Sequence, residues 1–231
     1  MIHFSKLSHF YRQKAALEDI SLSIPAHTLT AVVGPNGAGK STFLKIIAGL
    51  VKPSQGQFIH QDPFNLAYLP QQSSLDKTFP FSVKDVVAMG LWPKLGIGKS
   101  ISHAQHASLE QALERVGLKN VENRGLDDLS GGQFQRVLFA RLMLQDADVL
   151  LLDEPFAAVD ESTTQDLLGL LQEWHRQGKT ILAVMHNLSL VRRFFSDTII
   201  LARNLVAYGP SQEVLTTDNL LRTHGIMMGA L

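Results

Sequence analysis

The segment GPNGAGKS at residues 34–41 joins closely spaced glycines to a lysine and a hydroxyl residue. Glycines let the backbone turn tightly, so successive N–H groups point inward and form a cradle for anions. The apolar run TLTAVVG (28–34) predicts a buried strand before the segment, and the helical spacing of residues 41–50 predicts a helix after it. A helix that begins near Lys40 aims the positive end of its dipole at the same place. This pattern predicts a loop that binds the phosphates of a nucleotide.

Within this loop, the side chains add charge and a metal ligand to the backbone donors. The Lys40 ammonium can reach the β- and γ-phosphates, and the Ser41 hydroxyl can bind Mg²⁺. The alternative is that the segment is a chance glycine-rich turn. The strand predicted before it and the helix predicted after it argue against this alternative. The residues predicted to bind nucleotide here are Gly34, Asn36, Gly37, Gly39, Lys40, Ser41 and Thr42.

A second chemical feature is the pair of carboxylates at the end of the apolar run VLLLDEP (149–155). Side chains alternate along a strand, so Asp153 and Glu154 point in different directions. Catalysis at a phosphate needs a group that holds a metal and a group that orients or activates water. We therefore assign Asp153 to Mg²⁺ and Glu154 to the attacking water. The alternative, an ordinary charged strand end before Pro155, loses weight because a phosphate loop lies upstream.

The elements that position these residues can be read from the apolar pattern. Half-buried or buried strands are predicted at 16–24, 28–34, 67–71, 148–155 and 179–186, with a hairpin over 197–209. Helices are predicted at 103–117, 131–145 and 163–178, and residues 72–100 are expected to be rich in loops. Apolar strands that alternate with helices indicate an α/β fold with a mainly parallel sheet covered on both faces.

The composition excludes several classes of protein. Of the 231 residues, 45% are hydrophobic, which is enough to order the chain and argues against intrinsic disorder. No cysteine is present, so disulfides and thiolate metal sites are impossible. The 21 basic and 21 acidic residues cancel, which argues against non-specific DNA binding. No apolar run is long enough to cross a bilayer, and the first residues lack the order of a signal peptide. We therefore expect a soluble, intracellular protein.

The segment LSGGQ at residues 129–133 resembles the signature of ATP-binding cassette (ABC) ATPases, and it lies between the phosphate loop and the acidic strand, as in that family. The resemblance to this family extends over nearly the whole chain. The resemblance implies a P-loop NTPase (RecA-like) core with a mixed, largely parallel sheet, an N-terminal antiparallel β subdomain and a helical subdomain that carries the signature. One ABC ATPase domain would span residues 1–231, with its core in 1–75 and 146–231 and the helical subdomain in 76–145.

The resemblance also implies roles for single residues. Tyr11 would stack on adenine, although it could simply be a partly buried aromatic residue. Gln71 would sense Mg²⁺ and the membrane partner, with Gln72 as the neighbouring alternative. The segment 158–160 resembles the D-loop and gives Asp160 a catalytic role. His186 would contact the γ-phosphate, whereas a lone histidine at a strand end is usually structural.

The same resemblance implies a dimer with ATP between two copies of the chain. The signature of one copy would bind the γ-phosphate held by Lys40 of the other, through Ser130, Gly131, Gly132 and Gln133. The run SGG followed by a helical stretch offers free N–H groups at a positive helix end, which is a second anion site. Two such sites with one acidic pair make sense if they face each other across a two-fold axis.

The segments 80–90 and 153–160 are similar in sequence to the zinc and manganese importer branch of the family. This likeness implies an ATPase subunit, bound at the cytoplasmic face of the membrane, that serves a separate permease and indirectly an extracytoplasmic solute-binding protein. Zinc is the first expected cargo and manganese the second. The alternatives are an importer of iron chelates, haem or cobalamin, a non-transport ABC protein that clamps nucleic acid or a partner protein, and a nucleotide sensor without turnover. No nucleic-acid partner is expected.

Among the nine histidines, His103 and His106 are spaced so that they share one face of a predicted helix. Such a pair could bind a regulatory metal, but solvated helices often carry such pairs and no third ligand is evident. Mg²⁺ is the only metal that the sequence predicts with a defined ligand set.

Overall fold

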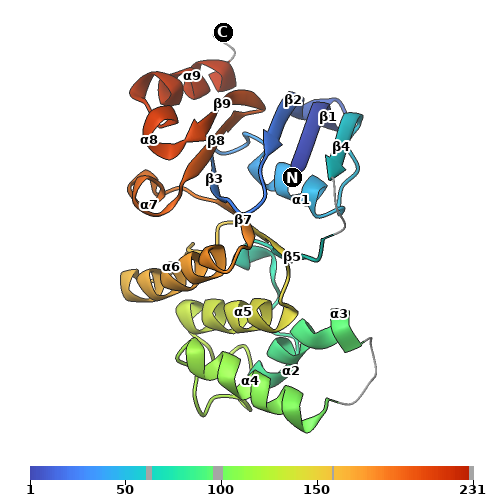
Figure 1. Cartoon of the computed structure of the whole chain (residues 1–231), viewed down its shortest axis with the longest axis vertical. Coiled ribbons are helices and arrows are strands. Elements are labelled where there is room, and N and C mark those ends of the chain that lie inside the picture. The colour runs from blue at the N-terminus through green and yellow to red at the C-terminus, as the bar shows by residue number, and fades with distance from the viewer. Residues whose placement is uncertain (61–63, 96–100, 158, 229–231) are drawn as a thin grey trace. The chain divides into compact units, whose positions relative to one another are not determined.

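The computed structural model describes residues 1–60, 64–95, 101–157 and 159–228 (Figure 1). The chain forms two compact units. The first unit comprises Met1–Tyr68, Asp148–Glu154 and Gln172–Leu231, and the second comprises Leu69–Ala147 and Pro155–Leu171. The division into a nucleotide-binding core and a helical signature subdomain, as expected from the sequence, stays a prediction.

The first unit is built on two sheets. A three-stranded antiparallel sheet has the order β2-β1-β4, from Lys14–Ile24, Ile2–Tyr11 and Gln55–His60. A six-stranded sheet has the order β5-β6-β7-β3-β8-β9. Its strands are Leu66–Leu69, Val149–Leu152, Thr180–Val184, Leu29–Val33, Asp197–Ala202 and Asn204–Pro210. Strands β6, β7, β3 and β8 run parallel, and β9 returns antiparallel to β8, which confirms the mainly parallel sheet and the terminal hairpin.

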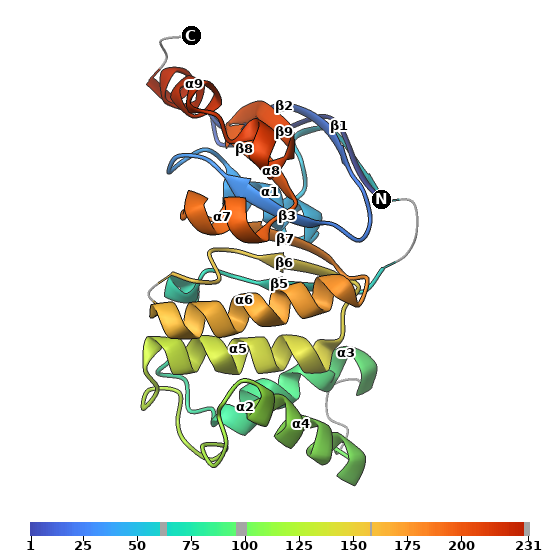
Figure 2. The same ribbon diagram turned by 60° about the vertical axis from the view of Figure 1, so that its left-hand side comes forward.

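Strands β3, β6 and β7 are buried along their whole length, as their continuous apolar runs predict. Every second residue of these strands faces the core that the sheet shares with α1 (Lys40–Ile47) and the antiparallel sheet. Phe43 of α1 lies at the centre of this core, with its ring centroid 4.8 Å from that of Phe4. The helices α7 (Leu188–Phe194), α8 (Ser211–Val214) and α9 (Thr217–Met228) complete the unit (Figure 2).

The second unit is mainly helical. It contains α2 (Val83–Ala88), α3 (Trp92–Leu95), α4 (His103–Arg115) and α5 (Gly131–Gln145), with short 3₁₀ turns at Gln72–Ser74 and Met89–Leu91. Helix α6 (Glu161–Arg176) begins in this unit and ends in the first. The predicted helices are confirmed, but α6 begins before the apolar spacing shows it. The Asp160 carboxylate accepts the N–H of Thr163 at 2.9 Å, and this cap allows the polar residues Glu161 and Ser162 to join the helix.

Strand β4 was not expected from the sequence. Its described side chains are mostly exposed, so the segment lacks the apolar alternation that marks a strand. Its position comes instead from pairing with β1, where Phe4 lies opposite Phe58.

The packing around Phe43 gives a first prediction. The side chain is fully buried, so the substitution Phe43→Ala leaves a cavity and should lower the free energy of unfolding by about 3–5 kcal/mol. Urea unfolding followed by circular dichroism measures this change. The control Leu221→Ala, at a side chain that is 64% exposed, should change the free energy of unfolding by less than about 0.5 kcal/mol. Equal effects of the two substitutions would contradict the assigned core.

Candidate nucleotide-binding site

The phosphate loop lies between β3 and α1, as the sequence predicts. Gly39 is the residue before α1, has a φ of 89°, and leaves the helix N-terminus without a side-chain cap. A Cβ atom at Gly39 would lie 2.2 Å from the carbonyl oxygen of Ala16, and one at Gly34 would lie 2.1 Å from that of Leu201. Only glycine fits at these two positions. No side chain of the cap residue covers the first N–H groups of α1, so these groups can bind an anion.

Lys40 is buried and points into the loop. Its Nζ donates to the carbonyl oxygens of Gly34 at 2.8 Å and Pro35 at 3.0 Å. Burial lowers the pKa of the Lys40 ammonium, and the nearby charges of Glu154 and then Asp153 act in the opposite direction. The loop thus holds a positive charge that is shielded from bulk water and available to a phosphate chain.

Asp153 follows β6 and is 3% exposed. Its Oδ1 accepts the Ser41 hydroxyl at 3.0 Å, and its Oδ2 accepts the Tyr68 hydroxyl at 3.3 Å. Burial raises the pKa of the Asp153 carboxyl, and the hydrogen bonds from Ser41 and Tyr68 oppose that rise. The structure therefore brings together Ser41 and Asp153, two of the predicted Mg²⁺ ligands. Tyr68 was not singled out in the sequence, because its link to Asp153 joins strands that lie 85 residues apart.

Glu154 and His186 form the second polar pair of the site. The Glu154 Oε1 atom lies 2.7 Å from His186 Nε2. Glu154 has a φ of 52°, a left-handed conformation that few residues other than glycine adopt and that costs about 1–3 kcal/mol. Such strain is typical of functional positions. Asn187, which follows His186, caps α7 by accepting the N–H groups of Ser189 and Leu190.

The first unit also contains the other residues predicted to bind nucleotide outside the helical unit. Asn36 and Gly37 are exposed at the loop tip, and Thr42 is half-buried in α1. Tyr11 is 50% exposed at the end of β1. Its ring and the His9 ring form a T-shaped pair with centroids 4.6 Å apart. An exposed, supported ring suits base stacking, and this role of Tyr11 stays a prediction.

The signature residues open α5 in the second unit. The Ser130 hydroxyl accepts the N–H of Gln133 at 3.2 Å, and the Gln133 side chain accepts the N–H of Ser130 at 3.1 Å. This capping box explains why the helix begins at Gly131. A Cβ atom at Gly132 would lie 3.2 Å from Asp160 Oδ2, so the signature glycine and the Asp160 carboxylate are in close contact within this unit.

The two candidate glutamines have different surroundings. The Gln72 side chain donates to the carbonyl oxygen of Gly131 at 3.0 Å, which ties it to the signature. Gln71 precedes the 3₁₀ turn, and its carbonyl oxygen accepts the Ser74 hydroxyl at 2.7 Å. Gln71 belongs to the second unit, whereas Ser41 and Asp153 belong to the first. Its part in the Mg²⁺ site stays a prediction.

Two further sequence observations can be followed in the structure. In the described parts of the chain, no group of three or more His, Cys, Asp or Glu side chains is placed to hold a metal ion, so His103 and His106 gain no third ligand there. Among the described residues, no helix is long and apolar enough to cross a membrane. Ala158, the first residue of the expected D-loop, lies outside the described residues.

The phosphate loop, the Asp153–Ser41 pair and the Glu154–His186 pair are the arrangement that a nucleotide-binding ATPase needs. The chain belongs to the ABC transporter family, because residues 17–157 match the family described as ABC transporter. This confirms the resemblance drawn from the LSGGQ segment.

Relatives and solved structures agree with this assignment. The manganese transport system ATP-binding protein MntB of Bacillus subtilis is 40% identical over 93% of this chain and 88% of its own length. The zinc transport system ATP-binding protein TroB of Treponema pallidum is 38% identical over 97% of this chain and 86% of its own length. A transporter described as of the metal-chelate ABC type, in an inward-facing conformation, has a TM-score of 0.85 at 27% identity and covers 96% of this chain and 88% of the solved chain. A dimeric bacterial ABC transporter cassette has a TM-score of 0.79 at 25% identity and covers 91% of this chain and 99% of the solved chain.

Two glycines of the loop give a matched prediction. Gly37 and Gly39 both have left-handed backbones, but a Cβ atom at Gly37 would lie 3.6 Å from its nearest neighbour, Met227 Cε, whereas one at Gly39 would lie 2.2 Å from a carbonyl oxygen. Both alanine variants share the backbone strain, so Gly39→Ala should lower the free energy of unfolding by about 1–3 kcal/mol more than Gly37→Ala. Urea unfolding without nucleotide measures the difference. Identical stabilities would show that the loop does not approach β2 as closely as described.

Proposed function

We propose that this chain is the ATP-hydrolysing subunit of an importer of transition-metal ions, and that it drives a separate membrane permease. The observation that carries the catalytic part is the Glu154–His186 pair, with 2.7 Å between Glu154 Oε1 and His186 Nε2, at the ends of strands next to the phosphate loop. A strained glutamate held by a histidine suits a group that must keep one orientation toward a water molecule.

In this proposal the first unit binds ATP and Mg²⁺. Lys40 and the backbone N–H groups of the loop neutralise the phosphate oxygens. The other residues proposed to bind the nucleotide here are Gly34, Asn36, Gly37, Gly39 and Thr42. Ser41 and Asp153 fit Mg²⁺, because their oxygen atoms lie 3.0 Å apart and oxygen ligands suit this hard cation. Gln71 is the proposed additional ligand. When bound, Mg²⁺ would supply charge neutralisation at the β- and γ-phosphates.

The catalytic step then falls to residues of the chain. Glu154 orients the attacking water and accepts its proton, and His186 holds the Glu154 carboxylate while its ring faces the γ-phosphate. A cavity of about 230 Å³ is lined by Gly34, Pro35 and His186 among others, so the space beside the loop and the histidine is open. Tyr11 stacks on the adenine base, an interaction that needs only an exposed aromatic ring.

A second copy of the chain completes the site in this proposal. Ser130, Gly131, Gly132 and Gln133 of one copy face the phosphate held by the other, and Asp160 lies beside them. The similarity to a dimeric cassette supports this arrangement. Symmetry supports it too, because a two-fold axis brings each signature to the partner's phosphate loop.

The names of the relatives support the proposed cargo. Their names specify manganese and zinc transport systems, which supports a transition-metal ion as the cargo. Zinc is the first candidate and manganese the second, from the likeness of residues 80–90 and 153–160 to the zinc and manganese importer branch. The chain would lie peripherally at the cytoplasmic face and bind a permease. A cavity of about 400 Å³ lined by Gln71, Leu75 and Lys77 among others supports docking there. An extracytoplasmic solute-binding protein would deliver the ion.

The substitution Glu154→Gln tests the catalytic role. It keeps the size of the side chain but removes its basicity, so kcat for ATP hydrolysis should fall by roughly 10²–10⁴-fold while ATP binding persists. Phosphate release and ATP titration calorimetry measure the two quantities. Lys40→Ala is the contrasting variant and should weaken ATP binding by roughly tenfold or more, because it removes a buried charge from the phosphate site. Full turnover in the Glu154→Gln protein would overturn the assignment.

The cargo is tested by uptake in cells. Deleting the gene should reduce zinc uptake, or manganese uptake if manganese is the cargo, and the wild-type gene should restore it whereas the Glu154→Gln gene should not. Uptake of radioactive zinc, manganese and chelated iron is compared in the same strains. A loss confined to chelated iron contradicts the proposed cargo, and normal uptake of all three contradicts the importer role.

A further inference from the structure

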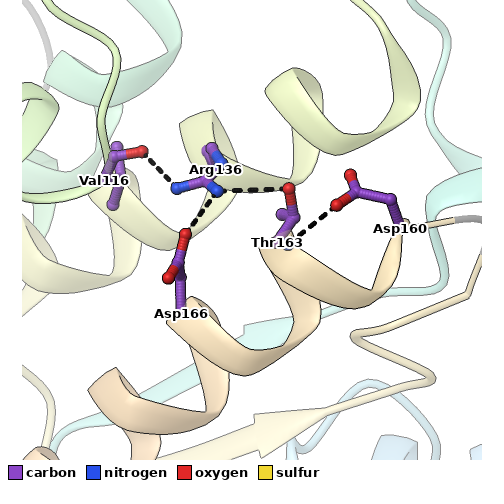
Figure 3. A network of polar contacts seen from close by, with 5 residues as sticks. All are labelled: Val116, Arg136, Asp160, Thr163 and Asp166. Atoms are coloured by element: carbon purple, nitrogen blue, oxygen red, sulfur yellow. Dashed lines mark hydrogen bonds and ion pairs between the residues drawn. The ribbon is translucent and has the colours of Figure 1, made fainter.

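The second unit contains a polar network that the nucleotide chemistry described above does not use. Arg136 of α5 donates to three acceptors: the Val116 carbonyl oxygen at 2.9 Å, the Thr163 hydroxyl at 3.1 Å and the Asp166 carboxylate at 2.7 Å (Figure 3). The Arg136 side chain is only 17% exposed. A guanidinium with three acceptors in place is fixed in orientation, because its donors lie in one rigid plane.

Thr163 passes this orientation on to Asp160. Its backbone N–H donates to Asp160 Oδ1 at 2.9 Å, and its hydroxyl accepts from Arg136 (Figure 3). Thr163 therefore contacts Arg136 through its hydroxyl and Asp160 through its backbone N–H. In agreement, the backbone N–H and then the side chain of Thr163 lower the pKa of the Asp160 carboxyl. The result is a relay of charge-assisted hydrogen bonds from Arg136 through Thr163 to Asp160.

The relay lies against the first turn of the signature helix. A Cβ atom at Gly132 would be 3.2 Å from Asp160 Oδ2 and 3.5 Å from Thr163 Oγ1. The Asp160 carboxylate therefore lies close to where a side chain at position 132 would begin. A shift of Asp160 would be felt directly at the turn whose N–H groups are proposed to bind phosphate.

We propose that Arg136 is a positioning residue, which holds the Asp160 carboxylate against the first turn of α5 through Thr163, whose hydroxyl accepts from Arg136 and whose N–H donates to Asp160. This inference rests on the proposed function, in which Asp160 and the signature are presented together to the nucleotide on a partner copy. The relay makes the two groups one rigid piece, so that the partner's nucleotide meets them in a single geometry. It thereby removes an ordering cost that would otherwise fall on closure of the dimer.

A purely structural role for Arg136 makes a different prediction. In that case the arginine only joins the end of α4 to the side of α6, through Val116 and Asp166, and the Thr163 hydroxyl contributes no more than any other buried hydroxyl. Thr163 separates the two cases because it touches Asp160 without belonging to the proposed phosphate-binding groups.

The experiment compares Thr163→Val, which removes the hydroxyl at constant size, with Thr163→Ser, which keeps it. Thr164→Val is the matched control, because Thr164 is similarly buried on the same helix turn and its substitution leaves the relay residues in place. We expect Thr163→Val to lower kcat roughly tenfold, while the ATP affinity of the single chain and the melting temperature stay near those of Thr164→Val. Thr163→Ser should retain wild-type turnover.

A second measurement needs no nucleotide. Carbon-detected NMR titration of the Asp160 carboxyl should show a higher pKa in Thr163→Val than in wild type and in Thr163→Ser. An unchanged pKa, or equal kcat in Thr163→Val and Thr163→Ser, overturns the proposal. Absence of ATP turnover in the wild-type chain would instead refute the proposed function, and the titration would still decide whether Thr163 fixes Asp160.

Discussion

The candidate site depends on a phosphate loop whose backbone approaches its neighbours more closely than a Cβ atom permits. Gly34 meets the carbonyl oxygen of Leu201 in β8, and Gly39 meets that of Ala16 in β2. The hairpin after β8 adds a hydrogen bond of 3.0 Å from the Arg203 N–H to the Ala38 carbonyl oxygen. The loop is thus held by main chain on both sides, and its N–H groups are oriented by the fold before any phosphate arrives. Such preorganisation avoids reorganisation during catalysis.

Lys40 in this loop and Asp153 after β6 are two ionisable groups in a poorly hydrated place. Burial alone disfavours the charged forms of Lys40 and Asp153, and the lysine is partly compensated by its attraction to Glu154 and Asp153. Opposite charges in a protein interior are seldom a net source of stability, because desolvation offsets their Coulomb attraction. The cluster is therefore best understood as a functional arrangement that the apolar core around Phe43 must support.

Local patterns predicted most of this arrangement and missed what depends on distant contacts. Apolar runs located β3, β6 and β7, and the residues between a strand and a helix located Lys40, Ser41 and Asp153. The strain at Glu154 and the hydroxyl of Tyr68 on Asp153 were not visible, since both arise from how separate strands meet. Arg136 was missed for the same reason: its acceptors come from α6 and from the end of α4. Strand β4 has no apolar signal because its described side chains are mostly exposed.

The two helix ends that are proposed to bind phosphate are prepared differently. The cap residue of α1 is Gly39, which has no side chain to compete with an anion for the first N–H groups. At the N-terminus of α5, the Ser130 hydroxyl already accepts the Gln133 N–H at 3.2 Å, near the long end of the normal range. A phosphate that binds the Gln133 N–H at α5 must share or replace that bond, whereas a phosphate at α1 displaces no side-chain cap. In the proposed mechanism, this difference favours nucleotide binding first at the phosphate loop and engagement of the signature only when a second copy closes over it.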